Sequence, residues 1–213
     1  MIFYSPINGD ATTTGIVSRP RTCFLMTQLG RPIPAILGEI RDSIIQVLKN
    51  YKMELIDADS VITGRDFLIK IWDLILGVPL GIAIIHKEMR PQTLANIFYE
   101  IGLMQAYGKD LLVIKTQRTR MPSDFARTEY IEFSTDFVNR LGRFVESHLS
   151  NANYYAHMAD QLERNPLLAI DYLKRAYLIS GEENYRMQAK EIFESADIQG
   201  RAKNSVEMLL VNF

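Results

Sequence analysis

Short apolar segments alternate with amphipathic helical segments four or five times between Thr22 and Leu149, and few folds accommodate such a chain. The apolar segments have the length and the flanking turn residues of buried strands. The predicted strands are 22–29, 53–58, 80–86, 110–115 and 130–133. The predicted helices are 32–50, 65–76, 94–107 and 136–149. This order predicts an α/β fold, a doubly wound parallel sheet with right-handed crossovers.

The chain changes character after Ser150, where only helical periodicity remains. Pro166 suits the first turn of a helix, because its missing N–H has no intrahelical partner there. Two apolar stripes are predicted, one of Tyr154, Met158 and Leu162 and one of Ala169, Leu173 and Ala176. We therefore predict three segments, namely an N-terminal arm (1–20), an α/β domain (21–150) and an all-helical extension (151–213).

The small residues of the second stripe resemble the packing positions of a single tetratricopeptide-type helical hairpin. One repeat does not make a stable array, so a helical cap or dimerisation element is the reading that we favour. A hairpin of this kind exposes an apolar face. We expect a homo-oligomer or a protein partner to bind through residues 153–213.

Bulk composition excludes several classes of protein. The 24 basic and 25 acidic residues leave a formal net charge of −1, so no global field favours nucleic acid or an anionic membrane. No apolar run reaches the roughly 20 residues of a membrane helix. No cluster has zinc-type spacing, so no metal is expected. The single Cys23 cannot form an intrachain disulfide, which favours a cytoplasmic location.

A carboxylate, Glu100, interrupts the otherwise apolar helix that is predicted after the third strand. Asn96 lies one turn earlier on the same face. A buried carboxylate costs several kcal/mol unless it is paired or neutralised, so the helix either satisfies this acid locally or uses it. The local alternatives are an interaction with a neighbouring loop, or an ion pair with Arg65 or Lys70.

The topology predicts where these residues meet. Ligands of doubly wound sheets bind beyond the carboxyl ends of the strands. Thr27 and Gln28 follow the first predicted strand, and His86 and Arg90 stand at the end of the third strand and in its loop. We expect these four residues to line a pocket with Glu100 and Asn96. His86 is either a core histidine with a satisfied ring or a proton shuttle.

Four segments carry a family resemblance, and they read CFLMTQLGRP, MELIDADSV, GIAII and NIFYEIGLMQAYGKDLLVI. Their order resembles that of the nucleoside 2-deoxyribosyltransferase-like and bacterial TIR-like nucleotide-binding proteins, which share a flavodoxin/TIR-like sheet. The match spans roughly residues 23–115. The segment from Asn96 to Gly102, followed by Gly108 and Lys109, is its most specific part.

The resemblance implies that Glu100 faces the glycosidic carbon of a nucleoside or of NAD, as a nucleophile or as the electrostatic partner of a ribosyl cation. No additional cofactor is then required, since NAD or a nucleotide is itself the substrate or ligand. The sequence departs from the family where its third strand commonly ends in Asp, because His86 stands there. The turn from Thr27 to Gly30 also lacks the usual proline and aromatic residue.

Two functions follow as hypotheses. The first is an enzyme, an NAD or nucleoside N-glycosidase or deoxyribosyltransferase-like hydrolase, in a bacterial antiphage pathway. The second is a non-catalytic nucleotide sensor that relays ligand binding to a partner through its C-terminal helices. A structural or assembly subunit is the third and plainest alternative.

Overall fold

Five parallel strands form the sheet of the computed structural model, which describes residues 16–30, 32–60, 66–119, 129–162 and 164–195 and the single residues 207, 210 and 213. The strands are β1 (Thr22–Met26), β2 (Glu54–Ile56), β3 (Leu80–Ile85), β4 (Asp110–Lys115) and β5 (Tyr130–Glu132). Their order across the sheet is β2-β1-β3-β4-β5. All four pairings are parallel, so the predicted doubly wound α/β fold is confirmed.

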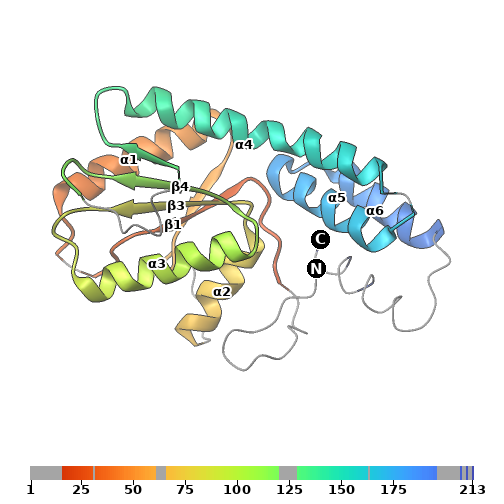
Figure 1. Cartoon of the computed structure of the whole chain (residues 1–213), viewed down its shortest axis with the longest axis horizontal. Coiled ribbons are helices and arrows are strands. Elements are labelled where there is room, and N and C mark those ends of the chain that lie inside the picture. Colours follow the sequence, from red (N-terminus) through yellow and green to blue (C-terminus); the bar gives the residue numbers. More distant parts are fainter. Residues whose placement is uncertain are drawn as a thin grey trace. The chain divides into compact units, whose positions relative to one another are not determined.

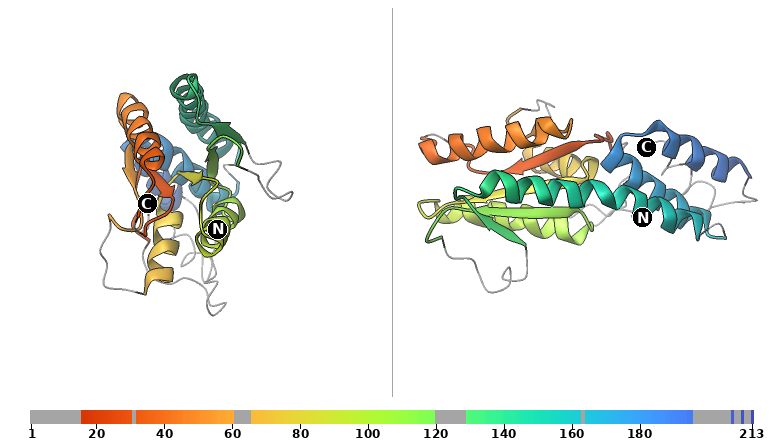
Figure 2. Two further views of the ribbon diagram at one scale, coloured as in Figure 1. Left: turned by 90° about the vertical axis from the view of Figure 1, so that its left-hand side faces the viewer. Right: turned by 90° about the horizontal axis from the view of Figure 1, so that it is seen from above.

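Helices cover both faces of the sheet (Figures 1 and 2). One face carries α1 (Ala35–Asn50) and the first half of α4 (Phe137–Asp160), and the other carries α2 (Phe67–Gly77) and α3 (Pro91–Ala106). Since successive side chains of a strand point to opposite faces, each strand contributes side chains to the apolar layers on both faces of the sheet. The continuous hydrophobicity of β3, which is buried at all six positions, follows from this double cover.

The layer under α2 and α3 determines how closely α3 approaches the sheet. Its buried side chains include Met26 from β1, Ala83 from β3 and Ile101 from α3. A Cβ atom on Gly81 would lie 2.6 Å from Cε of Met104 and 2.9 Å from Cε of Met26. A glycine at this position of β3 therefore lets α3 lie directly against the strand.

Local sequence explains several helix ends. The Asp66 carboxylate accepts hydrogen bonds from the backbone N–H groups of Leu68 and Ile69 at the start of α2 (2.9 and 3.4 Å). Gly108 follows α3 with a φ of 62°, the left-handed conformation that its position predicts. Asn165 caps α5 (Pro166–Ser180), and Pro166 occupies the first turn as predicted.

Helix α4 corrects the predicted end of the helix 136–149. The helix continues without a break to Asp160, so the closing helix and the first predicted helix of the extension are one element. The physical reason is that no Gly or Pro lies between Arg143 and Asn165, and the polar residues Ser150, Asn151 and Asn153 do not break a helix.

The chain divides into two compact units, an α/β unit (Arg21–His148) and a helical unit that begins at Leu149 and includes residues 16–20. Within the helical unit, α5 packs with α6 (Glu183–Ser195) around a shared apolar cluster. Ala169, Leu173 and Ala176 are buried as predicted. The other predicted stripe is wrong at Tyr154, which is exposed, whereas Met158 and Leu162 are half-buried and Ala159 is fully buried. Residues 1–15 of the predicted arm lie outside the described residues.

Candidate functional site

The site predicted from the sequence lies at the point where the sheet reverses its winding. The chain passes from β1 to β2 on one side and then to β3 on the other, so β1 and β3 are neighbours. The loops that leave their carboxyl ends run toward opposite faces, and this is the position at which doubly wound sheets bind ligands. Thr27 and Gln28 directly follow β1, and His86 directly follows β3.

The structure joins two of the predicted residues directly. Nε2 of His86 lies 3.2 Å from Oε1 of Gln28. The Gln28 amide nitrogen also donates to the carbonyls of Gly30 and Pro32, each at 3.0 Å. These three hydrogen bonds fasten the loop after β1 to the end of β3.

The same contacts fix the state of His86. The backbone N–H of Glu88 donates to Nδ1 of His86 at 3.3 Å, so Nδ1 keeps its lone pair and the proton belongs on Nε2. Burial lowers the pKa of His86, although the negative charge of Glu88 opposes this shift. Both ring nitrogens are therefore satisfied by the neutral imidazole, and His86 fits the satisfied core histidine of the two alternatives.

The side chain of Thr27 carries a buried hydroxyl that lacks a hydrogen bond to any described residue. Its Oγ1 is buried, and no hydrogen-bond partner for it exists among the residues that the structure describes. An unsatisfied buried hydroxyl costs about 1–3 kcal/mol. Thr27 follows β1 where the sheet reverses its winding, which is the position at which doubly wound sheets bind ligands.

Glu100 lies on the flank of α3, beside the stripe of Ile97, Ile101 and Met104 that is buried against the sheet. It is half-buried. Tyr107, two turns later on the same flank, meets Trp72 of α2 in an edge-to-face contact with ring centroids 6.1 Å apart. Glu100 therefore lies on the side of α3 that faces α2. Because helix side chains lean toward the helix N-terminus, its carboxylate is displaced toward the carboxyl edge of the sheet.

The electrostatics of Glu100 are unusual for a glutamate. Burial raises its pKa to about 7. Among the described residues, none donates a hydrogen bond to its carboxylate or forms an ion pair with it. The Lys70 ammonium, one predicted partner, donates to the carbonyl of Ala58 at 2.5 Å and lies over the Phe67 ring. The other predicted partner, Arg65, lies outside the described residues.

Asn96 and Arg90 take more open positions. Asn96 lies one turn before Glu100 and is exposed, and Arg90 is exposed at the start of α3. Within the described part of the chain, no hydrogen bond or ion pair links either of them to another predicted site residue. Both belong to the first half of α3 or to its start, on the side of the carboxyl ends of the strands, and their side chains are exposed.

Sequence reasoning missed Asp57, a buried acid at the carboxyl end of β2. Its carboxylate lies 2.5 Å from Nη1 of Arg41, and it accepts a hydrogen bond from the Ser60 N–H at 2.8 Å. Burial pushes the pKa of Asp57 upward, but Arg41 and Ser60 together outweigh this and lower it. The available signal was an acid inside the predicted strand 53–58, which the structure ends at Ile56, directly before Asp57.

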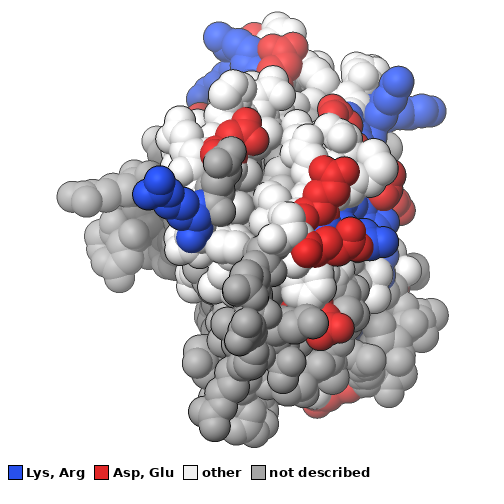
Figure 3. Space-filling view, turned by 90° about the vertical axis from the view of Figure 1, so that its right-hand side faces the viewer, with Lys and Arg blue, Asp and Glu red and all other residues white. Residues whose placement is uncertain are grey.

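Comparisons with known proteins do not assign the chain. No protein-family model matches it, and no curated protein matches it either. The described residues hold no group of three or more metal-ligating side chains. None of the described helices combines the length and apolar character needed to cross a bilayer. Acidic and basic side chains both occur on the face drawn in Figure 3, among uncharged ones.

Proposed function

We propose that the protein cleaves an N-glycosidic bond in a nucleotide or in NAD, with Glu100 as the group that acts on the sugar. One observation carries this proposal: Glu100 is a half-buried acid with a pKa raised to about 7 and no partner among the described residues. An unpaired acid of this kind costs stability, and such groups gather at functional sites.

The chemistry suits a carboxylate. Breaking an N-glycosidic bond passes through an oxocarbenium-like state in which the sugar gains positive charge. A fixed anion beside the sugar stabilises that charge or captures the sugar covalently, and a partly dehydrated site strengthens the interaction. The Thr27 hydroxyl and the Asn96 amide supply hydrogen-bonding groups for sugar hydroxyls. Arg90 supplies a cation for a phosphate.

The test is base release by the purified protein from NAD and from deoxynucleosides. We expect Glu100→Gln to lower turnover by at least roughly a hundredfold with a smaller effect on binding, because the charge matters most in the transition state. Glu39→Gln, an exposed position on α1, is the matched control and should leave turnover unchanged. Turnover by wild type should also rise as pH increases through about 7, since the anion is the active form.

A non-catalytic nucleotide sensor is the second candidate, and two observations favour it. The Gln28–His86 contact leaves no free ring nitrogen to carry a proton to a leaving base. Helix α4 begins in the α/β unit and ends in the helical unit, which gives a continuous element for a relay. Thermal stabilisation by a nucleotide without release of base would support the sensor and contradict the enzyme.

The biological setting that we propose follows from the resemblance of residues 23–115 to the nucleoside 2-deoxyribosyltransferase-like and bacterial TIR-like proteins. The partner is a nucleotide-type small molecule, and the pathway is bacterial antiphage defence in the cytoplasm. Assembly with a second copy or another protein would use residues 153–213. Light scattering tests assembly directly, and a monodisperse monomer at high concentration would contradict it.

A further inference from the structure

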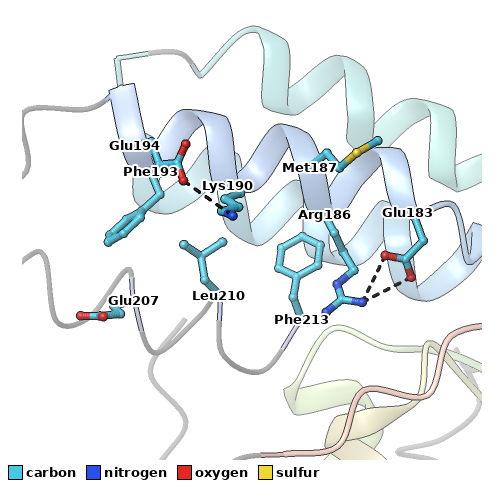
Figure 4. Close-up of a pocket in the computed structure, with 9 residues that line it drawn as sticks. All are labelled: Glu183, Arg186, Met187, Lys190, Phe193, Glu194, Glu207, Leu210 and Phe213. Atoms are coloured by element: carbon cyan, nitrogen blue, oxygen red, sulfur yellow. Dashed lines mark hydrogen bonds and ion pairs between the residues drawn. The ribbon is translucent and has the colours of Figure 1, made fainter.

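A cavity lies in the helical unit and belongs to no step of the proposed reaction. It has a volume of about 590 Å³, within the range of small-molecule sites. One wall is a stripe of α6, and the other is formed by three residues near the end of the sequence, Glu207, Leu210 and Phe213. Figure 4 shows Lys190 above Leu210 and Arg186 beside Phe213, whereas the Phe193 ring lies on the side of Glu207.

The apolar part of this cavity is aromatic and aliphatic. Phe193, Leu210, Phe213 and Met187 contribute it. Phe213 is held in place because its ring packs on Tyr177, with centroids 5.6 Å apart. Met187 is 58% exposed, so part of the apolar lining is open to solvent. The cavity therefore offers a preformed surface to an apolar or aromatic group.

The charges of the lining residues do not balance. Arg186 is held by Glu183 through contacts of 3.1 and 3.3 Å, and its guanidinium lies over the Tyr177 ring. Lys190 pairs with Glu194 at 3.8 Å. Each cation is thus offset by a glutamate on its own helix. Glu207 remains, and within the described residues no cation pairs with its carboxylate.

We propose that this cavity binds a small organic cation, an apolar or aromatic amine whose protonated nitrogen lies near Glu207 and whose body packs on Phe193 and Leu210. Carboxylates and aromatic rings together recognise ammonium groups, the first by Coulomb attraction and the second by cation–π contact. A matched anion would instead meet an uncompensated carboxylate, and a neutral molecule would gain only the apolar contact.

The experiment titrates the full chain with three probes of similar shape: phenethylammonium, 2-phenylethanol and 3-phenylpropionate. Binding is followed by the Met187 methyl signal in NMR spectra. We expect phenethylammonium to bind about tenfold more tightly than 2-phenylethanol, and 3-phenylpropionate to bind most weakly. Raising the salt concentration should reduce this preference, because Glu207 is exposed and its charge is screened.

Two variants test whether Glu207 causes the preference for phenethylammonium. Glu207→Gln keeps the shape of the side chain and should weaken phenethylammonium binding about threefold to tenfold. Glu191→Gln, an exposed position of α6 that does not line the cavity, should change nothing. The proposal is overturned if the three probes bind equally, if Glu207→Gln binds as wild type does, or if no Met187 shift appears up to about 10 mM probe. Base release from nucleotides has no part in this test, so the two proposals fail independently.

Discussion

Asp57 and Glu100 are acids in two regions of the α/β unit, and their surroundings move their pKa values in opposite directions. Asp57, at the end of β2, pairs with Arg41 and accepts a hydrogen bond from Ser60, and its pKa is lowered. Glu100, on the flank of α3, has no such partner among the described residues, and burial raises its pKa to about 7. Burial disfavours the charged form of both carboxylates, but among the described residues only Asp57 has nearby groups, Arg41 and Ser60, that offset this effect.

The difference separates an acid that stabilises the fold from one that costs stability. A paired and hydrogen-bonded carboxylate ties its element to a neighbour, here β2 to α1. An unpaired carboxylate in the same kind of environment weakens the folded state, and natural proteins retain such groups where activity requires them. The comparison can be tested by removing the cation that pairs with Asp57 and, separately, by removing the charge of Glu100.

The largest expected effect on stability is at Asp57. Arg41→Met should leave a buried, uncompensated carboxylate and lower the free energy of unfolding by about 3 kcal/mol at pH 7. This figure is at the low end for buried pairs, because the Arg41 side chain is 39% exposed and its charge is partly screened. Urea denaturation measures the change.

The pH dependence of that variant follows from the lowered pKa of Asp57. A carboxylate with a lowered pKa contributes stability above its unfolded-state value, and this contribution is lost as pH falls through the folded-state value. The difference between wild type and Arg41→Met should therefore shrink in acid. Equal stability of the two proteins at pH 7 would mean that the ion pair contributes nothing.

A smaller effect of opposite sign is expected at Glu100. Its pKa is higher in the folded state, so the folded state binds more protons between about 4.5 and about 7, and stability falls as pH rises through that window. Glu100→Gln removes this loss and should raise the free energy of unfolding at pH 8 by about 2 kcal/mol. At pH 4 the variant and wild type should be equally stable, and thermal denaturation at both pH values measures this.

The smallest effect is expected at Thr27. Thr27→Val replaces a buried hydroxyl that lacks a partner with a methyl group of similar shape, so stability should stay equal or rise by up to about 1 kcal/mol. Any nucleotide affinity should fall at the same time. A loss of more than about 1 kcal/mol would show that the hydroxyl is satisfied in the native protein.

Features with local causes were predictable from the sequence. The strand Asp110–Lys115 has the predicted bounds, because a buried apolar run ends there between a glycine turn and polar residues. Gly108 and Pro166 adopt the predicted conformations for equally local reasons. Glu100 also stood out by itself, since a lone acid in an apolar helix is visible without a structure.

Features that depend on distant partners were not predictable. Gln28 and His86 are 58 residues apart in sequence, and nothing in either segment indicates that each satisfies the other. Arg41 and Asp57 likewise belong to different elements. The continuation of α4 past Ser150 to Asp160 was not predicted, because the helical periodicity on the two sides of Ser150 was assigned to two separate helices, although no Gly or Pro lies between them.

The pKa of Glu100 in the folded protein tests the central claim most directly. Carboxyl ¹³C NMR of glutamate-labelled protein gives a titration curve for each side chain, and the spectrum of Glu100→Gln identifies the signal of Glu100. An acid that is buried without compensation should titrate with a midpoint near 7. A midpoint near the ordinary 4.5 would show that Glu100 is solvated or paired, and it would contradict the assignment of this residue as the functional acid.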